Sequence, residues 1–124
     1  MPNQVFLNKE GIVEQVCGGD QTAGSIRSLI EETNKITGKL RQQKKEVLIL
    51  NDFSKVKNAD YGAKKAALEG LANFEQDYER VAIFGASPFM KFMGESVIKA
   101  AGSGKRVKIF ADREEAAAWL LKKG

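Results

Sequence analysis

Glu46-Val47-Leu48-Ile49-Leu50-Asn51-Asp52 carries the strongest structural signal in the sequence. Its four consecutive aliphatic residues stand between charged residues and a polar turn. A strand with one face in water would alternate apolar and polar residues, so this run predicts a strand buried on both faces. Helical patterns precede and follow it, and we therefore expect an interior strand of a sheet whose connections are helices.

Strand and helix patterns alternate outward from this segment. Apolar runs at residues 81–84 and 107–110 predict two later strands, and residues 4–8 and 12–17 predict a hairpin that turns at Gly11. Helical periodicity predicts four helices, over residues 22–43, from 58 or 60 to about 76, from 88 to 101, and from 112 onward. The expected caps are Asp20 or Thr22 for the first, Asn58 or Asp60 for the second, Ser87 for the third and Asp112 for the last. The order β-β-α-β-α-β-α-β-α predicts a single α/β domain over residues 1–124, with a mixed, mainly parallel sheet and right-handed crossovers.

Three polar or small-residue segments need a separate interpretation. We expect Cys17-Gly18-Gly19-Asp20 to end the second strand in a turn, because neither phosphate-loop pattern, GxGxxG nor GxxxxGK[ST], is present there. Residues 52–59 are expected to form a polar loop after the central strand. The small residues that begin the next helix should let that helix lie close to the sheet; they are Gly62, Ala63, Ala66 and Ala67.

Composition favours an ordinary globular protein. Twenty basic and 16 acidic residues give a net charge of +4, which is too mild to indicate a specific nucleic-acid partner. Most clustered basic residues precede strands, where they complement helix dipoles; an anionic partner at that rim is the alternative. No run reaches the roughly 18 apolar residues of a membrane span, and one cysteine cannot form an internal disulfide. We expect a cytoplasmic protein without a membrane span.

The absence of histidine restricts the chemistry. It removes the commonest general base and the commonest metal ligand, so no metal and no cofactor are expected. Cys17, the single cysteine, is expected to be a small buried residue and not a nucleophile. Asp52 and Asp60 are the best carboxylate pair for an enzyme, although acidic residues at such turns more often act as caps. We therefore expect no enzymatic activity.

The rim at the carboxyl ends of the three later strands is the expected binding region, because open α/β sheets place ligands there. The free amides that follow Ser87 could hold an anion with help from Lys55 or Lys91, and a plain capped helix is the alternative. The residues collected at this rim are Asp52, Phe53, Ser54, Lys55, Tyr61, Gly85, Ala86, Ser87 and Phe89.

The helix over residues 88–101 carries large apolar residues on more than one face. Its core stripe is expected to consist of Met93, Val97 and Ala100 with either Phe89 or Met90. We predict that at least one of Phe89, Met90 and Phe92 faces a partner protein, a second copy of the chain or a bound ligand, because clustered Phe and Met mark contact surfaces and pocket walls.

Three segments together resemble the STAS superfamily, in its small stand-alone, anti-sigma-factor-antagonist-like branch. They are residues 47–53, residues 80–85, and the final strand 107–110 with the Glu115-Ala116-Ala117-Ala118-Trp119-Leu120 helix. The resemblance implies a sheet with helices mainly on one side. It also implies a non-enzymatic regulatory module that binds a partner protein or a small ligand near the turn after the central strand. The branch has been likened to lipid-binding CRAL-TRIO domains, which implies a hydrophobic ligand as an alternative.

The resemblance also concerns phosphorylation. Regulatory antagonists of the superfamily carry an Asp-Ser-Ser-Gly type motif, and its serine is phosphorylated. The corresponding run here is Asn58-Ala59-Asp60-Tyr61-Gly62-Ala63, in which Tyr61 stands where serine is expected. A serine-kinase switch is therefore not expected at this place, and nearby Ser54 does not match the motif's position.

Three hypotheses of function remain. The leading one is recognition of a partner protein through the rim and the 88–101 helix. The second is a carrier or sensor of a small apolar or anionic ligand, lipid-like or nucleotide-like, in a pocket between that helix and the sheet. The third is a carboxylate-based enzyme. An interior cavity would favour the second hypothesis over the first, and carboxylates facing each other in a cleft would favour the third.

Overall fold

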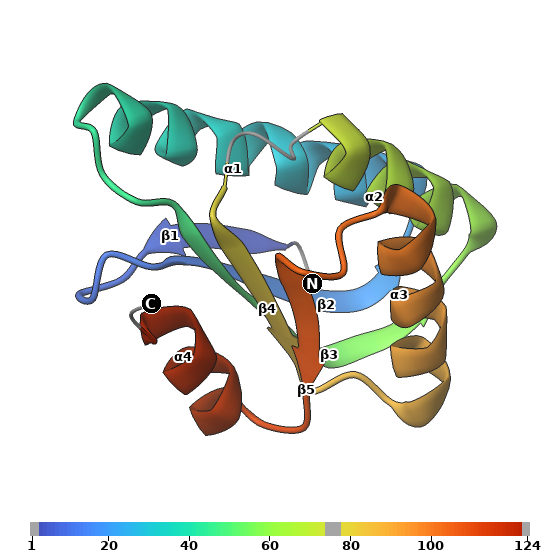
Figure 1. Ribbon diagram of the computed structural model, residues 1–124. Coiled ribbons are helices and arrows are strands. Elements are labelled where there is room, and N and C mark those ends of the chain that lie inside the picture. Colours follow the sequence, from blue (N-terminus) through green and yellow to red (C-terminus); the bar gives the residue numbers. More distant parts are fainter. Residues whose placement is uncertain (1–2, 74–77, 123–124) are drawn as a thin grey trace.

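A computed structural model gives the structure of the protein and describes residues 3–73 and 78–122 (Figure 1). The chain alternates strands and helices in the predicted order. The elements are β1 (Gln4–Leu7), β2 (Val13–Gln21), α1 (Ala23–Gln42), β3 (Leu48–Ala59), α2 (Tyr61–Asn73), β4 (Arg80–Phe84), α3 (Pro88–Ala101), β5 (Val107–Phe110) and α4 (Arg113–Leu121).

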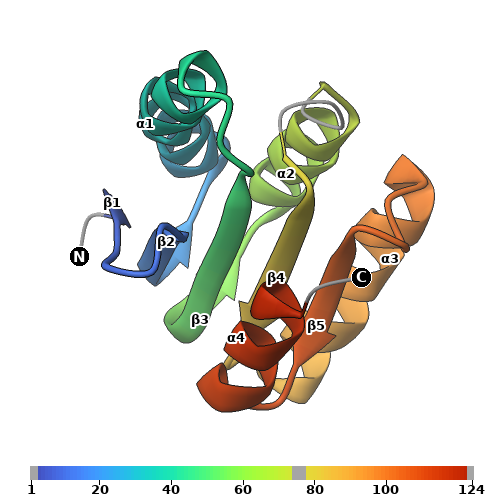
Figure 2. The same cartoon turned by 60° about the vertical axis from the view of Figure 1, so that its left-hand side comes forward.

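The strands form one mixed sheet in the order β1-β2-β3-β4-β5 (Figure 2). β1 is antiparallel to β2, and the other neighbouring strands are parallel. β3 lies between β2 and β4, and its residues Leu48, Ile49 and Leu50 are 7%, 6% and 1% exposed. The predicted fold class and the predicted interior strand are both confirmed.

Helices cover the two faces of the sheet unequally (Figures 1 and 2). Alternate residues of the strands point to opposite faces, so Ile49 and Val81 belong to the core under α1 and α3, with Leu40 and Ile98. The other face carries Leu48, Leu50, Ala82 and Phe84 and is covered by α4 through Ala116 and Leu120. Three helices therefore lie on one side and α4 on the other, as the resemblance to STAS proteins implied.

The predicted cap residues begin their helices. The Thr22 hydroxyl accepts the Ser25 amide of α1 at 3.2 Å, and Asp112 accepts the Glu115 amide of α4 at 2.9 Å. Asp60 accepts the Ala63 amide at 2.8 Å at the start of α2. Each bond satisfies an amide that has no partner within its helix. The predicted end of α2, near residue 76, lies outside the described residues.

β2 and β3 are longer than the sequence predicts. β2 continues through the Gly18-Gly19 pair to Gln21, and residues 18–21 pair in parallel with residues 55–59 of β3. The turn predicted at residues 17–20 and the loop predicted at residues 52–59 are therefore wrong. β4 ends opposite Asp52, so the extension of β3 has only β2 beside it and keeps polar, exposed residues. The pairing of β2 with β3 is irregular between Val16 and Gly18 and between Gly19 and Asp20.

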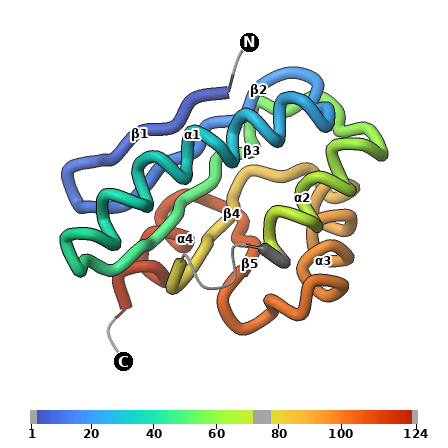
Figure 3. Tube along the Cα trace, turned by 90° about the horizontal axis from the view of Figure 1, so that it is seen from above, coloured from blue at the N-terminus to red at the C-terminus, as the bar shows by residue number. Residues whose placement is uncertain are grey.

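Helix α2 packs chiefly against its neighbouring helices. α2 contacts α1 and α3 much more than it contacts the strands, and Figure 3 shows it between these two helices. Its small residues serve the helix–helix contact, because Ala63 and Ala66 cluster with Ile26 of α1. A Cβ on Gly62 would lie 3.3 Å from the Cβ of Ala23. Among the described residues of α2, Leu71 is the large apolar side chain that packs against the core of the sheet.

Candidate functional site

A cavity of about 210 Å³ lies between the sheet and the layer of α1, α2 and α3. Helix α2 contributes the small residues Ala63, Ala67 and Gly70 to its wall, together with Lys64 and Leu71. The strands and the other helices contribute mainly aliphatic side chains and methionines. They include Ile49, Val81, Ile83, Val107 and Ile109 from the sheet, and Ile26, Leu29, Ile30, Met90, Met93, Val97 and Ile98 from α1 and α3.

Polar side chains form a hydrogen-bonded chain on the α1 side of this cavity. The Asn51 Nδ2 on β3 donates to Gln15 Oε1 on β2 at 2.9 Å. Gln15 Nε2 donates to Thr33 Oγ1 on α1 at 2.8 Å, and the Thr33 hydroxyl donates to the Leu29 carbonyl at 2.7 Å. All three side chains line the cavity. The chain crosses from the central strand to α1 and fixes the side chains that face the cavity.

Asn51 is the last residue of this series of hydrogen bonds. Its side chain is on the same face of β3 as Ile49, and the residue is 6% exposed. Its Nδ2 also lies 3.7 Å from the Cys17 sulfur. Within the described part of the protein, no group donates a hydrogen bond to Asn51 Oδ1. A buried acceptor without a partner costs roughly 1–3 kcal/mol, so this oxygen is an energetically unfavourable feature of the cavity wall.

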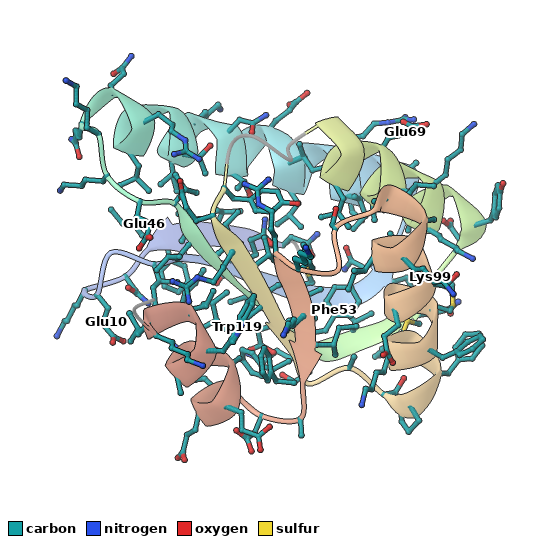
Figure 4. All side chains as sticks on the ribbon, in the orientation of Figure 1. Glu10, Glu46, Phe53, Glu69, Lys99 and Trp119 are labelled. Atoms are coloured by element: carbon teal, nitrogen blue, oxygen red, sulfur yellow. The ribbon has the colours of Figure 1, made fainter. Side chains whose placement is uncertain are left out.

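Three of the residues predicted for the binding region line the cavity: Phe53, Ala86 and Met90. Phe53 follows Asn51 by two positions on β3 and is half-buried; Figure 4 labels it between the sheet and α3. Met90 is buried on the inner face of α3. The cavity thus lies between α3 and the sheet, and its wall also includes residues of α1 and α2.

Asp52, Ser54 and Gly85 come together outside the cavity. Asp52 Oδ1 accepts the Ser54 amide at 2.9 Å and the Ser54 hydroxyl at 2.6 Å. Gly85 has φ +81°, and a Cβ on it would lie 2.8 Å from the backbone nitrogen of Ser54. Lys55 is exposed on the extension of β3. The Ser87 hydroxyl accepts the Met90 amide at 3.2 Å, as in an ordinary capped helix.

Tyr61, Phe89 and Phe92 point away from the core and are 78%, 64% and 72% exposed. Phe89 and Phe92 have no place in the core under α3, as the sequence indicated, and what they contact stays a prediction. The inner face of α3 carries Met90, Val97 and Ile98, with Met93 half-buried. Ala100, predicted for the core stripe, is exposed because α3 is rotated to bury Ile98 in its place.

The sequence interpretation missed the polar wall of the cavity. Neither Asn51, at the end of the aliphatic run, nor Gln15 is among the residues predicted for the binding region. A signal was present: Asn51 has the same parity as Ile49 along the strand, and Thr33 and Thr37 lie on the inward stripe of α1. Polar residues at positions that face a core need partners, and their clustering on adjacent elements marks a polar spot in an apolar wall.

The surroundings of the ionisable residues in and near the core indicate structural and not catalytic roles. Burial raises the pKa of the Cys17 thiol to about 11, which disfavours the thiolate. The guanidinium of Arg113 bonds both carboxylate oxygens of buried Glu14 at 2.8 Å and lowers the pKa of Glu14. Asp52 and Asp60 make separate local hydrogen bonds near opposite ends of a strand segment on the order of 20 Å long. They do not face each other in a cleft.

Residues 3–73 and 78–122 contain no group of three or more His, Cys, Asp or Glu side chains placed to hold a metal ion. Among the helices of the same residues, none has both the length and the apolar character that crossing a bilayer requires.

The chain is similar to a known protein family in sequence and to solved structures in fold. The family model described as SpoIIAA-like matches residues 13–121. No curated protein sequence is significantly similar to the chain.

Solved structures share the fold at low sequence identity. An uncharacterised protein of the DUF3478 family from Shewanella loihica PV-4, with a SpoIIAA-like fold, matches with a TM-score of 0.65 and 17% identity over 95% of this chain and 91% of its own. The unphosphorylated anti-sigma factor antagonist SpoIIAA matches with a TM-score of 0.60 and 17% identity over 93% of each chain. Phosphorylated SpoIIAA, the Bacillus cell fate determinant, matches with a TM-score of 0.62 and 17% identity over 94% of this chain and 97% of its own.

Proposed function

The chain belongs to the SpoIIAA-like (STAS) family, and from that premise we propose that it is a non-enzymatic binding module that carries or senses a small, mainly apolar ligand. The ligand occupies the cavity that α1, α2 and α3 enclose against the sheet. The observation that carries the proposal is this cavity of about 210 Å³, which lies beneath a helix of small residues and is lined chiefly by aliphatic side chains and methionines.

The size and charge of the cavity support an apolar ligand over an anionic one. An apolar cavity of about 150 Å³ is large enough to hold benzene, so the cavity here suits a molecule somewhat larger than one aromatic ring. Lys64 is the only charged residue among the described residues of the wall. A nucleotide needs more space and more cations than this wall supplies, which favours the apolar alternative of the carrier hypothesis.

The chemistry of the described residues supports a non-enzymatic role. Cys17 is fully buried and its pKa is raised to about 11, so it is a poor nucleophile at neutral pH. The Asp52 carboxylate accepts the Ser54 amide two residues along β3, and the Asp60 carboxylate accepts the Ala63 amide as a helix cap. The sequence contains no histidine that would serve as a general base.

Native mass spectrometry of the protein purified from its own host tests the proposal. We expect wild-type protein to carry a small molecule that is released on unfolding. Ala67→Leu, which places additional carbon atoms into the cavity, should carry much less of it. Ala100→Leu is the matched control, since the same atoms are added at an exposed position of α3. Wild-type protein that binds neither a native molecule nor small aromatic probes such as toluene would refute the proposal.

We propose a second candidate function, recognition of a partner protein through the outer face of α3, because Phe89 and Phe92 are 64% and 72% exposed on it. Exposed aromatic residues of this size are enriched in protein interfaces. The structural neighbour SpoIIAA is described as an anti-sigma factor antagonist, which supports a protein partner at the level of the family.

Serine substitution at the outer face separates this candidate from the first. Phe92→Ser should weaken self-association or a complex recovered from the host by about 1–3 kcal/mol, with little change in the free energy of unfolding. Lys91→Ser, at a neighbouring exposed position, is the control. If Phe92→Ser lowers the unfolding free energy and leaves association unchanged, this candidate is wrong.

A further inference from the structure

Asn51 Oδ1 points to the chemical class of the ligand. The residue is 6% exposed, lines the cavity, and receives no hydrogen bond at this oxygen from any described residue. We infer that the ligand is a neutral molecule about the size of one substituted ring that donates one hydrogen bond, from a hydroxyl or an N–H group, to Asn51 Oδ1. This inference rests on the proposed function and names the ligand of the same cavity.

The direction of the hydrogen-bonded chain fixes which atom of Asn51 is left over. The Thr33 hydroxyl donates its single proton to the Leu29 carbonyl, so its oxygen has to accept from Gln15 Nε2. Gln15 Oε1 then faces Asn51 and accepts from its Nδ2. The atom of the Asn51 amide that remains is the oxygen, which can only accept a hydrogen bond. The complementary ligand group is therefore a donor.

The rest of the cavity wall indicates that the ligand is uncharged and mainly apolar. Most of the remaining wall is made of residues such as Ile49, Phe53, Val81 and Met93, which offer no side-chain hydrogen bonds. Its other polar residues are Gln21, Thr37, Lys64 and Tyr78. A charged ligand would lose its hydration there and gain little in return. A ligand with one donor meets the free acceptor and buries its remaining surface against apolar side chains.

Phenol and toluene are a matched pair of probes, because they have the same number of heavy atoms and differ in one hydroxyl donor. Titrations of the full chain, followed by ¹H–¹⁵N chemical shifts, give the dissociation constants. We expect wild-type protein to bind phenol about three- to tenfold more tightly than toluene, since toluene leaves the buried acceptor unmet. Benzoate, which has the same ring and a negative charge, should bind more weakly than phenol.

Two isosteric variants locate the effect. Asn51→Leu removes the acceptor and should abolish the preference for phenol while toluene still binds. Asn34→Leu makes the same change at an exposed position of α1 outside the cavity wall and should leave the preference unchanged. Should Asn51→Leu not fold, the comparison of phenol with toluene on wild-type protein decides alone.

The outcomes separate this inference from the function on which it rests. Toluene that binds as tightly as phenol to wild-type protein overturns the donor assignment and leaves an apolar ligand in place. Benzoate that binds most tightly overturns the neutral charge and points to Lys64. Absence of binding by every probe, at concentrations up to their solubility, overturns both the inference and the proposed function.

Discussion

Filling the cavity should stabilise the protein. Ala67→Leu adds about three methylene equivalents, and burying them contributes roughly 2.4 kcal/mol at 0.8 kcal/mol for each. Ordering a leucine side chain costs about 0.5–1 kcal/mol. Because Ala67 is half-buried and lies on the cavity wall, the net gain should be about 1–1.5 kcal/mol in the free energy of unfolding.

Thermal and urea unfolding measure this gain. For a chain of 124 residues, the typical entropy of unfolding makes 1 kcal/mol equivalent to about 4 °C. Ligand-free Ala67→Leu should therefore melt about 4–6 °C above ligand-free wild-type protein. Ala100→Leu, at an exposed position, should stay within about 2 °C of wild type.

The opposite sign would refute the reasoning. If Ala67→Leu destabilises the protein by more than about 1 kcal/mol, the space beside Ala67 does not exist in solution and the leucine overpacks the contact between α1 and α2. The cavity would then be smaller than the structure indicates, and the proposal of a bound ligand would lose its main support.

Three further predictions concern the rest of the core. Arg113 lowers the pKa of Glu14, so the pair stabilises the fold above the ordinary pKa of 4.5, and this stability is lost as the pH falls through the folded-state pKa. The unfolding free energy of Glu14→Gln should therefore fall less steeply below pH 4.5 than that of wild type. Parallel curves for the two proteins would contradict this. Gly85→Ala should cost roughly 2 kcal/mol or more in urea unfolding, because φ is +81° and the new Cβ would meet the backbone of β3; Gly104→Ala, where a Cβ has open space, is the control. Cys17 is fully buried with a pKa of about 11, so a thiol reagent at pH 8 should label it only after unfolding, and rapid labelling of folded protein would show that it is accessible.

Local signals in the sequence predicted the framework correctly. Four aliphatic residues in a row identify the interior strand because only a strand covered on both faces tolerates them. Thr22, Ser87 and Asp112 identify helix starts because each side chain satisfies an amide only a few residues away. These features depend on neighbouring residues in the chain, so a single sequence is enough to find them.

Features that depend on pairing between distant segments were missed. Gly18-Gly19 resembles a turn on local propensity, yet residues 18–21 form a strand because residues 55–59 run beside them. The cavity depends on where α2 is held. Its alanines and glycines suggest close packing on the sheet, and most of the contacts of α2 are with α1 and α3. No local pattern distinguishes these two uses of small residues.

Helix α3 connects the two candidate functions. Its inner face presents Met90 and Met93 to the cavity, and its outer face exposes Phe89 and Phe92. Because the four residues alternate between the two faces within little more than one helical turn, a shift of α3 that accommodates a ligand also moves both exposed rings. Unbranched methionine side chains adapt to ligands of different shape, so part of the change can be absorbed without moving the helix. Binding of phenol to the cavity should therefore alter the backbone chemical shifts of residues 89–93 as well as those of β3. Shifts confined to β2 and β3 would mean that the cavity and the outer face of α3 act independently.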